Sequence, residues 1–190
     1  PSDPAGNTFY ATNQNTSMLL ELEIGKNSPT RTLAMEKSPA QVVFLDETYM
    51  AVAEAHGDSI AIVNRATMTA DAHVPIFDVD APRGASPSAL AFDGTNKRLY
   101  ATLAGINAVG VYDVTMGTPP TITKAGMIST AWWPTGVIVD QDGSLVIING
   151  KGHGVGADES DLDWSQGNIT DLMHGSVQRV PAAELANLTM

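Results

Sequence analysis

The chain has 190 residues, of which 43% are hydrophobic and 16% charged, so it can bury the core of one or two domains. Its net charge of −11 and isoelectric point near 4.5 leave no basic surface for a phosphate backbone, which excludes nucleic acid and anionic membranes as expected partners. No apolar run approaches the roughly 20 residues of a membrane span, and the absence of cysteine excludes disulfides, thiolate metal sites and cysteine nucleophiles.

The first predicted strands cover residues 8–12 and 18–22, and a third lies near residues 32–35. They correspond to the second, third and fourth strands of the units that follow along the chain. We therefore interpret this stretch as a repeat unit that lacks its first strand.

A proline then opens an apolar strand at regular intervals. Pro39 precedes the first such strand, Pro87 follows 48 residues later, and Pro134 another 47 residues further on. Proline is tolerated at the first position of a strand, where its missing N–H costs least. A period of roughly 40 to 50 residues is typical of propeller blades, each of which is one four-stranded sheet.

Each proline strand is followed by a polar turn and by further predicted strands. Second strands are predicted at 49–53, 99–102 and 145–148, third strands at 59–63, 108–112 and 175–180, and weaker fourth strands at 72–76 and 125–128. Two of the turns contain Asp93-Gly94 and Asp142-Gly143, and Asp-Gly supplies the positive φ angles of tight hairpins. These carboxylates are therefore interpreted as turn residues. Leu185 and Leu188 stand at helical spacing, which predicts a short helix in the tail.

These repeats predict an all-β fold, a β-propeller with blades of four antiparallel strands. The single domain contains blades at about 1–37, 38–85, 86–131 and 132–190, with a loop insertion at 150–174. Nearly four blades are present, whereas propellers close with about four to eight. We expect the chain to be a fragment of a larger ring of about seven blades, with its remaining blades in another chain or segment. A closed four-bladed ring is the alternative.

Particular residues resemble a known family. Residues 9–12 (Phe-Tyr-Ala-Thr) and 98–102 (Arg-Leu-Tyr-Ala-Thr) are similar to the Tyr-Val-like strand of YVTN-type bacterial and archaeal propellers. The fourth unit resembles the propeller portion of phosphoesterase-associated proteins of the alkaline-phosphatase type, through Trp133-Pro134-Thr135, residues 149–154 and residues 181–185. Asp46-Glu47 departs from this pattern, because it replaces the usual Asp-Gly turn.

The resemblance implies a propeller that accompanies a phosphoesterase domain. In that family the metal ligands and the nucleophile belong to the phosphoesterase domain, which nothing in this sequence matches, so no catalytic residue is carried over. We expect an extracytoplasmic location, periplasmic or secreted, although a chain without cysteine also suits a reducing cytosol.

In a propeller the loops between second and third strands open on the same face as the loops that lead into first strands. Binding residues often lie on loops held by a rigid scaffold. The predicted ligand-binding residues on this face are His56, Arg83, Trp132, Trp133, Lys151 and His153. The alternative is that Trp133 packs between blades and that the histidines are merely exposed.

The insertion contains the densest carboxylates of the chain. Asp158, Glu159, Asp161 and Asp163 offer oxygen ligands for calcium, although the glycine and bidentate glutamate of a complete calcium loop are absent. A solvated acidic loop is the alternative, and no other cofactor is expected. His153 and His174 bracket the insertion and are weak metal candidates, and residues 150–156 form a glycine-rich connector without phosphate-loop spacing.

The leading functional hypothesis is a noncatalytic propeller scaffold that binds a ligand or a protein partner on its loop face. It is based on the repeat and on the absence of a recognisable catalytic motif such as Gly-x-Ser-x-Gly. One alternative is a propeller hydrolase, either a lactonase or a metal-assisted enzyme, with its site on the same face. Another is a structural subunit of a surface or multi-subunit assembly.

Overall fold

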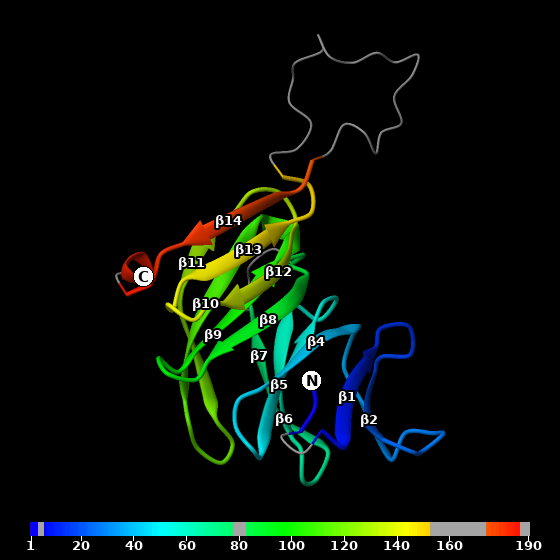
Figure 1. Cartoon of the computed structure of the whole chain (residues 1–190). Helices are drawn as coiled ribbons and strands as arrows, with labels where there is room; N and C mark the ends of the chain where they lie inside the picture. The colour runs from blue at the N-terminus through cyan, green and yellow to red at the C-terminus, as the bar shows by residue number, and fades with distance from the viewer. Residues whose placement is uncertain (4–5, 78–82, 153–173, 187–190) are drawn as a thin grey trace, which may run out of the picture.

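The computed structural model describes residues 1–3, 6–77, 83–152 and 174–186, and Figure 1 shows four antiparallel sheets that follow one another along the chain. Sheet 1 contains β1 (Thr8–Asn13), β2 (Met18–Glu23) and β3 (Arg31–Ala34). Sheet 2 contains β4 (Pro39–Phe44), β5 (Tyr49–Glu54), β6 (Ser59–Asn64) and β7 (Thr69–Pro75).

Sheet 3 contains β8 (Pro87–Asp93), β9 (Arg98–Leu103), β10 (Ala108–Thr115) and β11 (Thr121–Ser129), with the short 3-10 turn η1 (Ala104–Ile106) after β9. Sheet 4 contains β12 (Pro134–Val139), β13 (Leu145–Asn149) and β14 (Ser176–Val180), followed by the single helical turn α1 (Ala182–Leu185). In every sheet, strands that are consecutive in sequence are neighbours in space. The first strands β4, β8 and β12 lie beside one another, as inner strands do in a propeller. The chain is therefore a partial β-propeller, as the repeat predicts.

The anchor prolines take equivalent places in three sheets. Each lies opposite the last residue of the following strand, in the pairs Pro39–Glu54, Pro87–Leu103 and Pro134–Asn149. A shift in register follows each proline, so that the first strand bends at the same point. The 48- and 47-residue spacing seen in the sequence thus corresponds to one repeated backbone geometry.

The residue before each proline has a left-handed backbone. The φ angles are 48° at Ser38, 50° at Ser86 and 59° at Trp133. Its carbonyl accepts a hydrogen bond from the residue that follows the second strand, over 3.0 Å, 3.3 Å and 2.9 Å respectively. A left-handed φ is rare for a bulky side chain and persists only where the surroundings fix it. Trp133 is the bulkiest side chain held in this way.

The hairpin turns depend on side-chain caps. Asn13, Asn64 and Asp93 each end a strand, and the Oδ1 of each accepts two backbone N–H groups of the turn. The positive φ after Asp93 falls on Lys97 (54°), so the prediction for Gly94 is wrong. The reason is length: four residues connect β8 to β9, and a longer loop places the left-handed residue at its end. Gly143 does have a positive φ, of 79°.

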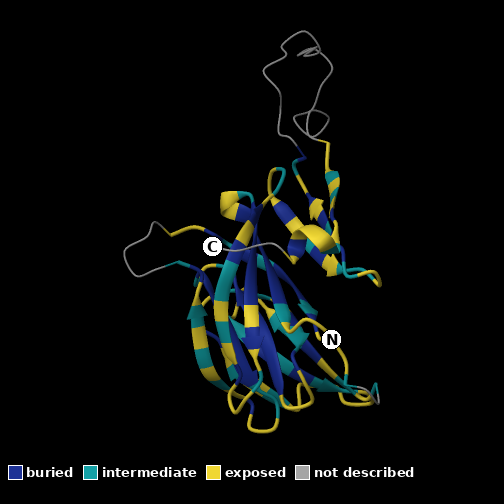
Figure 2. Ribbon diagram, turned by 90° about the vertical axis from the view of Figure 1, so that its left-hand side faces the viewer, coloured by how far each residue is buried: buried dark blue, intermediate teal, exposed yellow. Residues whose placement is uncertain are grey.

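Three apolar clusters fill the spaces between neighbouring sheets. Val52 packs with Tyr10 between sheets 1 and 2, whereas its neighbour Ala51 packs with Leu99 between sheets 2 and 3. Tyr100 and Ile147 belong to the third cluster, between sheets 3 and 4. Figure 2 shows the buried colour along the central strands, which is expected where alternating side chains are covered on both faces of a sheet.

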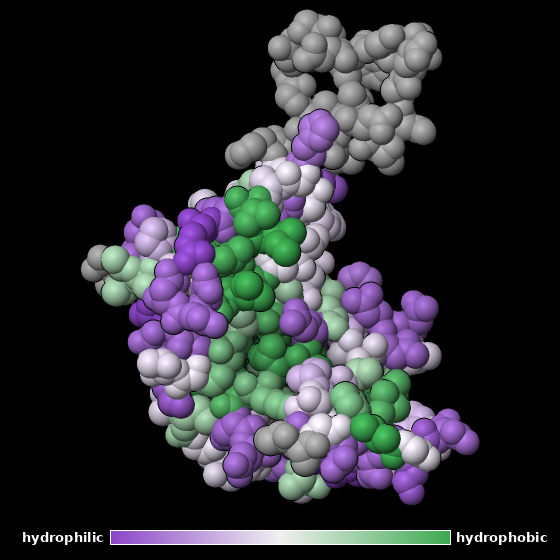
Figure 3. Space-filling view, viewed as in Figure 1, coloured by the Kyte–Doolittle hydropathy of each residue, from purple (hydrophilic) through white to green (hydrophobic). Residues whose placement is uncertain are grey.

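The outer face of sheet 4 is apolar and uncovered in the described part of the chain. Ile138 is 60% exposed, Ile148 52% and Val177 71%. Ile148 lies opposite Val177, so the two share one face of the sheet, and Figure 3 shows a green patch over this region. Among the described residues, no helix has the length and apolar character needed to cross a bilayer.

Candidate functional site

The link from sheet 3 to sheet 4 presents two tryptophans on the loop face. The backbone N–H of Trp133 donates to Oδ1 of Asn107 over 2.9 Å, and the carbonyl of Trp132 accepts the N–H of Lys151 over 3.1 Å. The two tryptophans are 51% and 42% exposed, in sequence order. Lys151 Nζ lies 4.3 Å from the centroid of the Trp133 ring, which is a cation–π contact. Loops from two sheets therefore fix this aromatic pair.

Asn149 ends β13 and lies opposite Pro134, the residue that follows Trp133 in the chain. The residue is wholly buried, and its Nδ2 donates to Ser176 Oγ over 3.3 Å. Its Oδ1 has no hydrogen-bond partner in the described part of the chain. A buried acceptor without a partner costs about 1–3 kcal/mol, so such a group requires an explanation. We call Asn107, Trp132, Trp133, Asn149 and Lys151 the loop-face site.

The structure brings together three of the predicted ligand residues, namely Trp132, Trp133 and Lys151. Within the described ranges, His56 and Arg83 share no hydrogen bond or ring contact with them. His56 is exposed, and its Nδ1 lies 2.9 Å from Ser38 Oγ.

Arg83 is exposed and precedes a loop that the buried Asp58 holds through the N–H groups of Gly84 and Ser86, over 2.6 Å and 3.0 Å. The other predicted residues lie outside the described part of the chain: His153, Asp158, Glu159, Asp161 and Asp163. The calcium interpretation of the insertion therefore stays a prediction.

A second polar group lies between sheets 1 and 2, toward the loop face. Glu54 is wholly buried, and its carboxylate accepts hydrogen bonds from Ser59 Oγ over 2.7 Å and from the Glu36 N–H over 3.0 Å. His73 Nδ1 lies 2.9 Å from Glu54 Oε2. We call Glu36, Glu54, Ser59 and His73 the Glu54 cluster. One signal of this cluster is present in the sequence, because Glu54 ends a strand that is otherwise apolar.

A second buried glutamate between sheets 1 and 2, Glu21, forms an ion pair with Arg31. Glu21 is 4% exposed and accepts hydrogen bonds from Arg31 Nε and from the Tyr10 hydroxyl, each over 2.8 Å. The hydrogen bonds from Arg31 hold the pKa of Glu21 below its usual value, against the effect of burial. Arg31 also donates to the carbonyls of Arg65 and Ala66 in sheet 2, over 2.8 Å and 2.7 Å. This network joins two blades and is structural.

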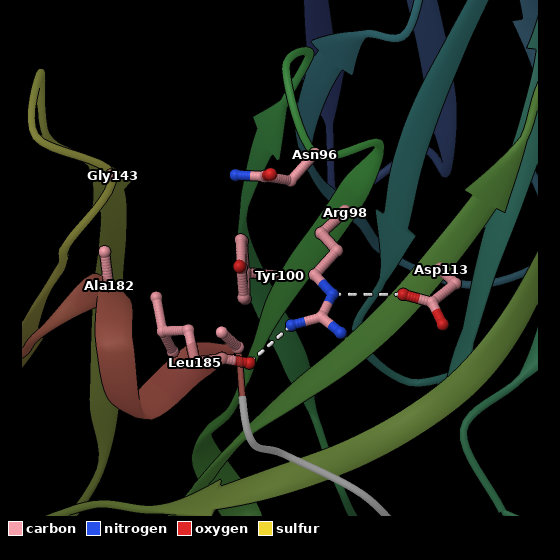
Figure 4. Close-up of a pocket in the computed structure, with 8 residues that line it drawn as sticks. Asn96, Arg98, Tyr100, Asp113, Gly143, Ala182 and Leu185 are labelled. Carbon is pink, nitrogen blue, oxygen red and sulfur yellow. Dashed lines mark hydrogen bonds and ion pairs between the residues drawn. The ribbon is translucent and has the colours of Figure 1, made fainter.

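A cavity of about 490 Å³ lies between sheet 3 and α1 (Figure 4). Arg98 points across it, forms an ion pair with Asp113 over 3.1 Å, and donates to the carbonyl of Leu185. Burial raises the pKa of Tyr100, which also lines the cavity. Because the cation is already paired inside the chain, we interpret this cavity as the place where α1 docks on sheet 3.

Solved structures match the chain at low sequence identity. Hydrazine synthase from Kuenenia stuttgartiensis has a TM-score of 0.71 at 22% identity, over 96% of this chain and 45% of that chain. A candidate 6-phosphogluconolactonase from Bacteroides uniformis has a TM-score of 0.65 at 15% identity, over 77% and 45%. The WD40 repeats of RRP9 have a TM-score of 0.63 at 12% identity, over 80% and 44%.

The fold thus places the chain in the class of β-propellers. The chain spans about half the length of these solved structures. No protein-family model matches the sequence, and a comparison with curated proteins finds no match. At these identities the likeness is one of fold alone.

Proposed function

We propose that the chain is a noncatalytic binding module, a set of propeller blades that binds a ligand or a protein partner at the loop-face site. One observation carries this proposal: two half-exposed tryptophans are fixed in one loop, with the ammonium group of Lys151 over the ring of Trp133. Tryptophan is enriched among the interface residues that contribute most of the binding energy. The expected ligand has a flat apolar face for the tryptophans and an acidic group for Lys151.

The test is a fragment screen by ligand-observed NMR with aromatic and cyclic carboxylic acids. Compounds that bind the wild type are expected to lose at least tenfold in affinity in Trp133→Ala and in Lys151→Met. The matched control is Ile24→Ala, which removes another exposed apolar side chain, 67% exposed, after β2. Binding that survives both site substitutions, or that Ile24→Ala weakens equally, would disprove the proposal.

The uncovered face of sheet 4 supports a scaffold role in a larger ring. We infer that further propeller blades, in another chain or segment, cover Ile138, Ile148 and Val177, because equivalent faces of sheets 1, 2 and 3 are buried against the next sheet. Val177→Asp is expected to abolish association with those blades in a mass measurement of the assembly, whereas Lys26→Asp, in the exposed turn after β2, leaves it intact. An unchanged mass in Val177→Asp would contradict this inference.

A hydrolase is the second candidate function. Its support is the carboxylate and imidazole of the Glu54 cluster, together with the fold shared with a candidate 6-phosphogluconolactonase. The expected result would be lactone hydrolysis by the wild type and its loss in His73→Ala. A YVTN-type assignment, an accompanying phosphoesterase domain and an extracytoplasmic location all stay predictions.

A further inference from the structure

The Glu54 cluster brings three metal-binding side chains together from three segments. Glu36 belongs to the link between β3 and β4, Glu54 ends β5, and His73 lies in β7. One ligand atom of each lies within 4.8 Å of the other two. Ligand atoms around one zinc ion are about 3 to 4 Å apart, because metal–ligand bonds are about 2 Å long. Small side-chain adjustments would therefore place all three atoms around one ion.

The electrostatics of the cluster favour a cation. Glu54 is wholly buried and lies close to a second carboxylate, that of Glu36. Within the described residues, the ion-pair partner of Glu54 is the imidazole of His73, which carries a charge only when it is protonated. Glu21 shows the contrast, because it has the guanidinium of Arg31 as a permanent partner. A buried carboxylate is stabilised by a paired charge, so a cation held between Glu54 and Glu36 would stabilise this cluster.

We propose that Glu36, Glu54 and His73 bind a divalent transition-metal ion of the zinc type. One imidazole and two carboxylates form a donor set that suits zinc, whereas calcium and magnesium prefer oxygen ligands alone. The His73 side chain is 31% exposed and Glu36 is exposed, so the ion can enter and keep a fourth position for water. Ser59 remains hydrogen-bonded to Glu54 and orients its carboxylate. This site is separate from the loop-face site and does not depend on the function proposed for it.

The test is isothermal titration of the EDTA-stripped full chain with zinc chloride. We expect one site whose affinity falls at least tenfold in Glu36→Gln and in His73→Gln. Glu36 is exposed, so its substitution leaves the core intact even if His73→Gln folds poorly. Cobalt(II) absorption provides a second readout, because loss of the imidazole ligand changes the visible spectrum of the bound ion.

Control variants separate this site from other metal-binding residues. His56→Ala and His174→Ala are expected to bind zinc like the wild type, and so is a double variant with Asp161→Asn and Asp163→Asn. The proposal is overturned if no zinc binds, if Glu36→Gln and His73→Gln both keep full affinity, or if a control variant removes the binding. Displacement of zinc by millimolar calcium would also overturn it.

Discussion

Arg31 pairs with the buried carboxylate of Glu21 between sheets 1 and 2, so we expect its removal to lower the stability of the chain. Arg31→Met keeps the length of the side-chain stem but leaves the buried carboxylate of Glu21 without its ion pair. It also removes the hydrogen bonds from the guanidinium to two carbonyls of sheet 2. Breaking a buried pair costs about 3–5 kcal/mol. The Arg31 side chain is 39% exposed, so we reduce the expected loss to about 2–3 kcal/mol.

Thermal unfolding followed by circular dichroism measures this loss. For a chain of 190 residues, about 2–3 kcal/mol corresponds to a decrease in Tm of roughly 4–12 °C. The matched control is Arg179→Met, which removes surface ion pairs with Asp140 and Asp142 and is expected to unfold at the wild-type temperature. Adding Glu21→Gln to Arg31→Met should recover part of the loss, because the unpaired charge is then absent.

The contribution of the Glu21–Arg31 pair to stability should depend on pH. The pKa of Glu21 is lowered in the folded chain, so its contribution is present above the unfolded value of 4.5 and disappears as the pH falls through the folded pKa. The difference in stability between the wild type and Arg31→Met should therefore be large at pH 7 and shrink below about pH 4.5. The reasoning is refuted if Arg31→Met and Arg179→Met unfold at the same temperature at pH 7.

The remaining predictions concern substitutions of single residues. Tyr112→Phe should raise the free energy of unfolding by about 1 kcal/mol, because the buried Tyr112 hydroxyl has no partner among the described residues. Tyr10→Phe should lower it by about 1–2 kcal/mol, because the hydrogen bond to Glu21 is lost. Urea denaturation measures both changes. Gly105→Ala should lower Tm by several degrees, because its Cβ would lie 1.8 Å from the Gly84 carbonyl oxygen, whereas Gly94→Ala, with its nearest atom at 3.9 Å, should not. Both Asn107→Ala and Asn107→Gly lose the hydrogen bond to the Trp133 N–H. Asn107→Ala should weaken loop-face binding more, because only glycine adopts the left-handed φ of 54° without strain. NMR titration measures the difference in affinity.

The repeat made the blades predictable from sequence. Pro39, Pro87 and Pro134 mark one register position in three sheets, and the alternation of apolar residues around them fixes which face of each strand is buried. Strand ends were less predictable, since β11 begins at Thr121, four residues before the predicted start. Its outer position exposes alternate residues and leaves only a weak apolar pattern.

The sites were predictable only where local sequence determines them. Trp132 and Trp133 lie in a loop whose face follows from the blade topology, and Lys151 lies in the neighbouring loop of the same face. The Glu54 cluster was missed, because its contacts join residues of three different strands of sheet 2 and of the link that precedes this sheet. Pairing with Pro39 places Glu54 at the loop-face end of β5. The residues around Glu54 in the sequence do not indicate that His73, two strands away, contacts it across the sheet.

The partners of the anchor prolines suggest how one scaffold can hold different chemistry. The last residue of the second strand is Glu54 in sheet 2, Leu103 in sheet 3 and Asn149 in sheet 4, and all three are buried at the loop-face end. Leu103 packs in the apolar core, Glu54 organises a carboxylate–imidazole cluster, and Asn149 has a buried acceptor without a partner among the described residues. The backbone geometry at this position is the same whichever side chain stands there, because the proline and the bulge set it. A change of residue there alters the chemistry of the loop face while the apolar alternation that specifies the fold is retained.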